Sequence, residues 1–117
     1  MRNAMIIETN KEAVKSVIDA VTEICGMHVH LSVFNDPFTG IKHGVENPPD
    51  IVFTEANMKQ INGFDVMRIL KQNNIRAQFI FLSNEDRWKA EATRLWVLGW
   101  VHNPPTQEEI QKIKGRI

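Results

Sequence analysis

Residues 49–64 read PDIVFTEANMKQINGF, and this stretch decides the fold. Asp50–Glu55 is a short β-branched run of the kind that is buried in a parallel sheet. Asn62-Gly63 marks a turn, and Phe64–Gln72 then carries apolar residues at helical spacing. A buried strand followed closely by an amphipathic helix is the repeating unit of α/β proteins.

The rest of the chain repeats this unit. The expected strands are Met5–Ile7, Met27–Phe34, Asp50–Glu55, Ala77–Leu82 and Trp100–His102. The expected helices cover residues 11–25, capped by Asn10 or Thr9, residues 36 to about 43 or 45, residues 64–72, a segment capped by Ser83 or Asn84, and a segment from Thr106 through Ile113. Because parallel strands need right-handed helical crossovers, we expect a doubly wound (βα)5 flavodoxin-like fold, a five-stranded parallel sheet with helices on both faces.

The composition is that of an ordinary globular chain. Of 117 residues, 43% are hydrophobic and 24% charged, which argues against disorder or a coiled coil. The 14 basic side chains balance the 14 acidic ones, so no overall charge favours nucleic acid or an anionic membrane. Apolar runs are too short to span a bilayer, and the N-terminus lacks the pattern of a signal peptide. We therefore expect one cytoplasmic domain over residues 1–117, with no direct nucleic-acid or membrane partner.

Functional groups of doubly wound sheets gather beyond the carboxyl ends of the strands. At these ends the sequence places several acidic, amide and hydroxyl side chains. They are Glu8, Thr9, Asn10, Asn35, Glu55, Asn57, Ser83, Asn84 and Asn103.

Residues 49–64 resemble the central signature of bacterial response-regulator receiver domains, Pro-Asp-apolar-apolar-apolar-x-Asp followed by x-x-Met-Pro-x-Met-Asp-Gly-Phe. Residues 79–83 (FIFLS) and 100–104 (WVHNP) are similar to the last two strands of that family, so the resemblance covers nearly the whole chain in the correct order. It implies phosphotransfer from a phosphohistidine to an aspartate. Two acids help to hold Mg²⁺ in that family, and a Ser or Thr and a Lys bind the phosphoryl oxygens.

This sequence departs from the family at most of those positions. Glu55 stands at the phospho-acceptor position, and its extra methylene moves the carboxylate by about 1.5 Å, a displacement that can cost ~100-fold in rate. Glu8 matches the first acid of the acidic pocket, but Thr9 replaces a second one. Of the two phosphoryl-contact positions, Ser83 matches, whereas Asn103 replaces the Lys and removes the fixed positive charge.

These departures predict a degenerate receiver, or pseudo-receiver, with no active catalytic residues. We expect no enzyme activity and no cofactor, and we expect phosphorylation-independent contact with a histidine kinase or another signalling protein. Two alternatives stay open: a working receiver, for which Glu8, Glu55 and Asn57 are weak Mg²⁺ candidates, and the N-terminal regulatory module of a DNA-binding transcriptional regulator. Glu55 is expected to be a remnant carboxylate, either solvated or hydrogen-bonded to Ser83 or Thr9; the alternative, that it mimics phosphoaspartate, is weakened by the missing Lys.

Three tryptophans fall close together near the end of the sequence. Trp88 and Trp96 are eight residues apart, close to one face of the expected fourth helix, and Trp100 holds the family's switch position. They are either core residues or an exposed surface for a partner or homodimer, formed by the fourth helix, fifth strand and fifth helix. In the second case Trp88→Ala or Trp96→Ala should raise the dimer dissociation constant. Trp100 is expected to stay in one orientation, since an indole is hard to bury there.

Three smaller features complete the sequence-based expectations. His28 and His30 are interpreted as the polar side of an edge strand in preference to a metal site. Cys25, the single cysteine, is interpreted as a buried inert thiol in preference to a nucleophile. The resemblance also implies a cis bond between Asn103 and Pro104.

Overall fold

The computed structural model describes residues 2–117 as alternating strands and helices. In chain order the elements are β1 (Asn3–Ile7), α1 (Lys11–Cys25), β2 (His30–Phe34), α2 (Pro37–Glu46), β3 (Ile51–Glu55), α3 (Gly63–Gln72), β4 (Gln78–Leu82), the 3₁₀ turn η1 (Asp86–Trp88), α4 (Lys89–Arg94), β5 (Gly99–Val101) and α5 (Gln107–Lys114). Among these residues no helix is both long and apolar enough to cross a lipid bilayer.

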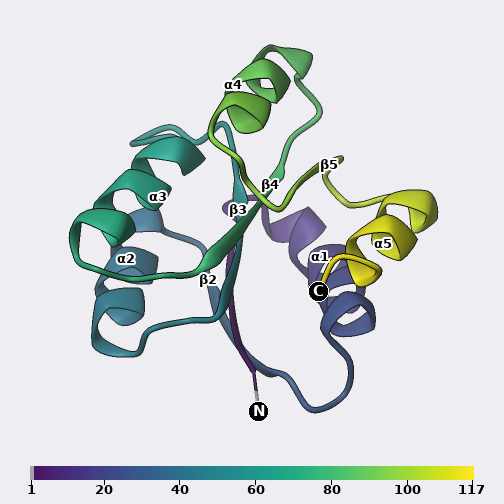
Figure 1. Ribbon diagram of the computed structural model, residues 1–117, viewed down its shortest axis with the longest axis horizontal. Coiled ribbons are helices and arrows are strands. Elements are labelled where there is room, and N and C mark those ends of the chain that lie inside the picture. Colours follow the sequence, from purple (N-terminus) through teal and green to yellow (C-terminus); the bar gives the residue numbers. More distant parts are fainter. Residues whose placement is uncertain (1) are drawn as a thin grey trace.

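All five strands form one parallel sheet in the order β2-β1-β3-β4-β5 (Figure 1). Helices α1 and α5 cover one face of the sheet, and α2, α3 and α4 lie on the other. The doubly wound (βα)5 flavodoxin-like fold is therefore confirmed. The strand order reverses between β1 and β3, the kind of point at which ligand crevices form in such sheets.

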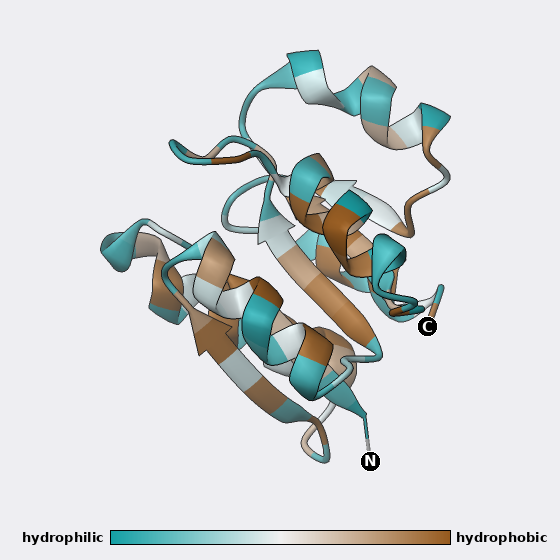
Figure 2. Ribbon diagram, turned by 90° about the vertical axis from the view of Figure 1, so that its left-hand side faces the viewer, coloured by the Kyte–Doolittle hydropathy of each residue, from teal (hydrophilic) through white to brown (hydrophobic). Residues whose placement is uncertain are grey.

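Alternate residues of each central strand point to opposite faces, so the sheet separates two hydrophobic cores. Ala4 and Ile6 of β1 lie in the core with α1 and α5, whereas Met5 and Ile7 lie against Gly44 and Gly40 of α2, in the core that α3 also covers. The strands in the middle of the molecule are hydrophobic along most of their length (Figure 2). Burial on both faces explains why these strands read as continuous apolar runs.

The helix starts follow the local sequence signals in three cases. The side chain of Asn10 accepts a hydrogen bond from the backbone N–H of Glu12, so Asn10 caps α1 and Thr9 is left to other partners. Asp36 caps α2 just before Pro37, and Thr106 caps α5 in a reciprocal capping box.

Several strand ends differ from the prediction, most of all the start of β2. β2 begins at His30, since Met27 and His28 form a turn after Gly26, which has a φ of 87°. β5 covers Gly99–Val101 and ends before His102, whose backbone N–H donates to the carboxylate of Glu109.

The fourth helix also differs from the prediction, because neither Ser83 nor Asn84 caps it. Glu85 keeps an extended backbone (φ −108°, ψ 116°), so the helical turn starts only at Asp86. The side chain of Asn84 is used elsewhere: its Nδ2 donates to the carbonyl of Asn103 at 3.0 Å, and its Oδ1 accepts from the Asn103 N–H at 3.1 Å. α4 itself has six residues and ends at Arg94.

Candidate functional site

The strand ends that the sequence singled out meet at one edge of the sheet. The loops after β1 and β3 are neighbours because these strands pair directly, with Ile7 opposite Thr54. Gly63, the first residue of α3, lies so close to this edge that a Cβ added to it would be 2.4 Å from the Glu55 carbonyl oxygen. Its N–H donates to the Ala56 carbonyl at 2.9 Å. This close approach fixes the backbone from which the Glu55 side chain projects.

Glu55 reaches across to the loop after β1. Its Oε1 accepts hydrogen bonds from both the backbone N–H and the hydroxyl of Thr9, the latter at 2.7 Å. Thr9 is one of the two partners expected for this carboxylate. The other, Ser83, is not bonded to Glu55: its hydroxyl accepts from the N–H of Glu85 at 3.0 Å.

Glu8 is fully buried beside Glu55, with an exposed fraction of 0%. Burial raises the pKa of its carboxyl to about 8, and the charge of Glu55 and a hydrogen bond with it act in the same direction. Hydrogen bonds from the Asn103 side chain and the Asn10 backbone lower the pKa by less. Glu8 is therefore mostly protonated at neutral pH.

Asn103 takes the place that the resemblance assigns to a lysine. Its Nδ2 lies 3.3 and 3.2 Å from the two carboxyl oxygens of Glu8, and the peptide bond to Pro104 is cis, as the resemblance implied. The clamp between Asn84 and the Asn103 backbone holds this loop in place. The sequence offers Asn84 as a helix cap and not as a partner of Asn103, because a contact between two loops leaves no local pattern.

The side chain of Asn57 belongs to a different hydrogen-bond network, which joins the loops after β3 and β4. Its Nδ2 donates to Oε1 of Glu85 at 3.1 Å, and Oε2 of Glu85 pairs with Arg87 at 2.6 Å. The loops after β3 and β4 are thereby tied together beside Glu55.

The donor set does not fit Mg²⁺. That ion needs hard, charged oxygen ligands at near-octahedral positions. Both Glu8 oxygens face the amide donor of Asn103, and one Glu55 oxygen already accepts two hydrogen bonds from Thr9. Across residues 2–117, no cluster of three or more His, Cys, Asp or Glu side chains is placed to hold a metal ion.

The three tryptophans do not share one helical face. The expectation that Trp88 and Trp96 do so is wrong, since α4 ends at Arg94 and Trp96 lies in the following turn. Trp88 is half-buried against Phe64, with ring centroids 5.6 Å apart. Trp100 is half-buried and lines a groove of about 240 Å³ with His102 and Lys112. A homodimer or partner surface of α4, β5 and α5 stays a prediction, as does a fixed orientation of Trp100.

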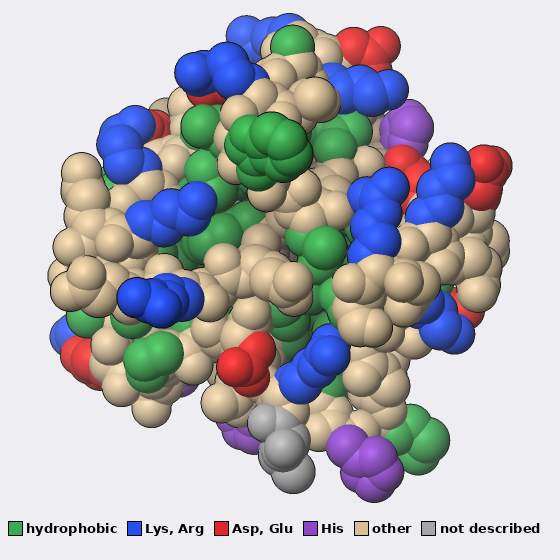
Figure 3. Space-filling view, viewed as in Figure 1, with side chains coloured by type: hydrophobic (Ala, Val, Ile, Leu, Met, Phe, Trp, Pro, Cys, Tyr) green, Lys and Arg blue, Asp and Glu red, His purple; other side chains and the backbone are tan. Residues whose placement is uncertain are grey.

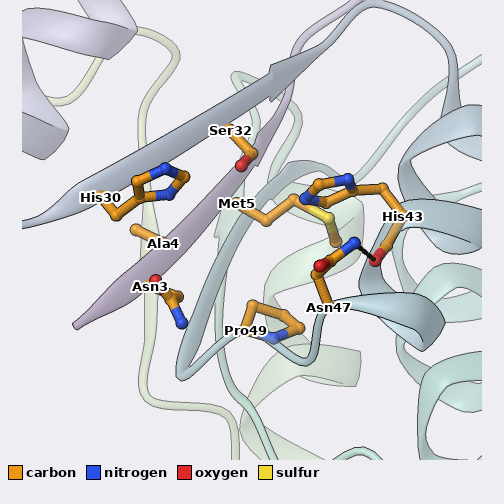
Figure 4. A pocket seen from close by; sticks show the side chains of 8 residues that line it. All are labelled: Asn3, Ala4, Met5, His30, Ser32, His43, Asn47 and Pro49. Carbon is orange, nitrogen blue, oxygen red and sulfur yellow. Dashed lines mark hydrogen bonds between the residues drawn. The ribbon is translucent and has the colours of Figure 1, made fainter. Parts of the chain in front are cut away.

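The histidine pair of the sequence is also separated. His30 lies on the edge strand β2, as interpreted, but His28 lies in the turn before it. Figure 4 shows His30 facing a small pocket of about 130 Å³, with His43 of α2 across from it. Cys25 is partly buried, and this burial raises the pKa of its thiol, in keeping with an inert side chain.

Comparisons with known proteins show which solved structures share this fold. No protein-family model matches the sequence, and no curated protein matches it. Several solved structures do match. The chemotaxis protein CheY4 of Vibrio cholerae shares 15% identity at a TM-score of 0.77, over 100% of this chain and 98% of that one.

Two further solved structures are similar over nearly their full lengths. A response regulator of Desulfuromonas acetoxidans is 19% identical, with a TM-score of 0.77 and 99% and 95% of the two chains covered. A DNA-binding response regulator of the LuxR family from Staphylococcus aureus is 13% identical, with a TM-score of 0.76 and coverages of 97% and 99%. The chain thus has the (βα)5 fold of the response-regulator receiver domains.

Proposed function

We propose that this protein is a receiver-like domain of two-component signal transduction that acts through protein–protein contact and does not depend on phosphorylation. The observation that carries the proposal is the state of the acceptor position. Glu55 is bound by Thr9, and its neighbour Glu8 is a buried carboxyl whose raised pKa keeps it mostly neutral.

Phosphoryl transfer to a carboxylate needs an in-line approach and cationic groups that neutralise the transferred oxygens. The arrangement of these side chains disfavours both requirements. The Glu55 oxygen that meets Thr9 would have to give up two hydrogen bonds before it attacked a phosphorus atom. Asn103 offers a neutral amide in place of a lysine ammonium, and it donates to Glu8. We therefore assign the domain no enzyme activity of its own.

The same geometry favours a remnant carboxylate over a mimic of phosphoaspartate. A mimic would direct its negative charge toward the two phosphoryl-contact positions, Ser83 and Asn103. Here the charge of Glu55 is directed to Thr9, while Ser83 bonds the backbone of Glu85. We therefore propose as partner a histidine kinase or another signalling protein that recognises one fixed conformation, and with it a cytoplasmic location.

Phosphorylation assays with a restored variant test this proposal. The protein is incubated with acetyl phosphate and Mg²⁺, and intact mass is measured for the native chain and for the triple variant Thr9→Asp, Glu55→Asp, Asn103→Lys. We expect no phosphoryl adduct on the native chain and a measurable one on the triple variant, because the variant regains an acid pair and a fixed cation. The double variant Thr9→Asp, Asn103→Lys, which keeps Glu55, is the matched control for the acceptor itself.

A stable phosphoryl adduct on native Glu55 would overturn the proposal in favour of a working receiver. Titration of the native chain with Mg²⁺, followed by tryptophan fluorescence, gives an independent measure. We expect no saturable change in emission at millimolar Mg²⁺, and a saturable one in the triple variant.

A further inference from the structure

Helix α4 ends in a Schellman motif whose left-handed position is filled by tryptophan. The N–H of Trp96 donates to the Thr93 carbonyl at 3.3 Å, and the N–H of Val97 donates to the Ala92 carbonyl at 3.4 Å. These two bonds define the motif. The first residue after the helix cap, here Trp96, must then adopt a positive φ, and its φ is 56°. Glycine usually holds this position because it has no Cβ to clash with the backbone.

Trp96 gains no burial in return for this unfavourable backbone. Its exposed fraction is 92%, whereas Trp88 and Trp100 are half-buried. A large aromatic side chain in water stabilises nothing within the isolated domain. Exposed aromatic side chains of this kind are typical of the central residues of protein–protein interfaces.

The indole stands beside a groove, here called the Trp96 groove, of about 370 Å³. The almost fully buried Met67 and Phe79 make its floor apolar, the turn from Leu95 to Leu98 forms one wall, and Gln78 adds a polar side chain. The groove lies at the start of β4 and before β5, so it opens at the amino edge of the sheet, opposite the loops that hold Glu55.

The charged groups around the Trp96 groove are all positive. Lys71 and Arg116 line it, no acidic side chain does, and neither cation forms an ion pair within the described part of the chain. The Nη1 of the exposed Arg116 donates to the Leu98 carbonyl at 2.9 Å, which holds the guanidinium at the rim of the groove. Figure 3 shows this face with hydrophobic side chains in its middle and mostly Lys and Arg around them.

We propose that the Trp96 groove docks a segment of a partner protein in which an apolar side chain is flanked by Asp or Glu residues. The apolar floor and the exposed indole would receive the apolar side chain, and Lys71 and Arg116 would pair with the carboxylates. The formal net charge of zero favours a peptide over a nucleic acid, whose phosphates attract proteins with an excess of positive charge. This surface deepens the proposed function by giving its protein–protein contact a place, and its test is independent of whether Glu55 accepts a phosphoryl group.

The test selects peptides from a random display library for binding to the folded domain. Peptides that also bind the Trp96→Gly variant are removed by counter-selection. We expect the enriched sequences to carry an apolar residue flanked by acids. Anisotropy titration of the strongest peptide, labelled with a fluorophore, should show binding about tenfold weaker for Trp96→Gly and for Lys71→Glu, a change of about 1.4 kcal/mol. Added salt should weaken binding to the native chain.

Thermal unfolding separates this role from a structural one. We expect Trp96→Gly to unfold a few degrees higher than the native chain, because glycine relieves the left-handed backbone. Loss of binding together with a gain of stability is the result that supports docking. Phe38→Ala, which removes another aromatic side chain of 52% exposure on α2, is the matched control and should bind the peptide as the native chain does.

Several results would overturn the proposal. They are a library without enrichment, enriched peptides that are neutral or basic, and peptide binding unchanged by Trp96→Gly. Binding of a thymidine oligonucleotide or of phosphatidylserine vesicles that is lost in Trp96→Gly would assign the groove to another class of ligand. Self-association lost in that variant, measured by sedimentation, would assign it to a second copy of the chain.

Discussion

The side-chain amide of Asn103 donates to both carboxyl oxygens of Glu8, at 3.3 and 3.2 Å, across a sequence separation of 95 residues. A lysine at position 103 would hold Glu8 as a carboxylate, since an ammonium group favours the charged form of a neighbouring acid. An amide exerts much less of this effect. The buried Glu8 can then keep a proton, and the repulsion between Glu8 and Glu55 is relieved without a metal ion.

Stability should therefore fall as pH rises. The pKa of Glu8 is about 8 in the folded chain against an ordinary value of 4.5, so between these values the folded state binds more protons than the unfolded state. The free energy of unfolding should decrease across that interval and level off above pH 8. Glu8→Gln removes the titration and should stabilise the chain at neutral pH by ~1–3 kcal/mol, as measured by urea unfolding over this range.

Asn103→Lys is the companion variant for this measurement. It should lower the pKa of Glu8 and flatten the pH dependence, whereas Asn103→Ala should not flatten it. If the native slope persists unchanged in Glu8→Gln, then another group is responsible for it.

The hydroxyl of Thr9 should contribute measurably to stability. Thr9→Val keeps the shape of the side chain but removes the 2.7 Å hydrogen bond to Glu55, so we expect a loss of ~1–2 kcal/mol. Thr9→Ser keeps the hydroxyl and should lose less. A double-mutant cycle of Thr9→Val with Glu55→Gln should give a nonzero coupling energy; strictly additive effects would mean that this contact carries no stability.

Gly63 should tolerate no side chain. A Cβ at this position would lie 2.4 Å from the Glu55 carbonyl oxygen and 3.0 Å from the Phe81 ring, so α3 would have to shift away from β3. We expect Gly63→Ala to lower the free energy of unfolding by about 2 kcal/mol. Gly115→Ala is the control, since its added Cβ meets nothing closer than 3.5 Å and should change the urea midpoint little.

Trp88 should act through its ring and not through its N–H group. The ring packs on Phe64, and the Arg87 guanidinium lies 4.7 Å from its centroid, while the buried Nε1 has no acceptor in the described part of the chain. Trp88→Phe should therefore be nearly neutral, whereas Trp88→Ala should lose ~1–3 kcal/mol in thermal or urea unfolding. Equal losses in both variants would indicate that the N–H group has a partner.

Much of this architecture follows from local patterns. The apolar runs of β3 and β4 are long enough to be recognised as strands buried on both faces, and the caps at Asn10, Asp36 and Thr106 mark helix starts through short-range hydrogen bonds. Parallel topology then brings Glu8, Thr9 and Glu55 to one edge of the sheet, and so their proximity was predictable.

Other features depend on contacts that no local pattern records. The end of α4 was missed because its left-handed position carries Trp96 where glycine is usual, so the helix had no visible stop signal. The raised pKa of Glu8 requires its complete burial and the neutral amide of Asn103, which arrive from distant parts of the chain. The contact between Asn84 and the Asn103 backbone likewise forms only when two loops meet.

The positive φ of Trp96 also has a stereochemical consequence. A residue of opposite chirality prefers the mirror-image region of backbone space, so a D-tryptophan introduced by chemical synthesis would fit this turn without steric conflict. Such a chain would keep the exposed indole and remove the conformational penalty, which no natural amino acid does. Comparing the free energy of unfolding of chains with L- and D-tryptophan at position 96 would measure how much folding stability the positive φ of the native residue costs.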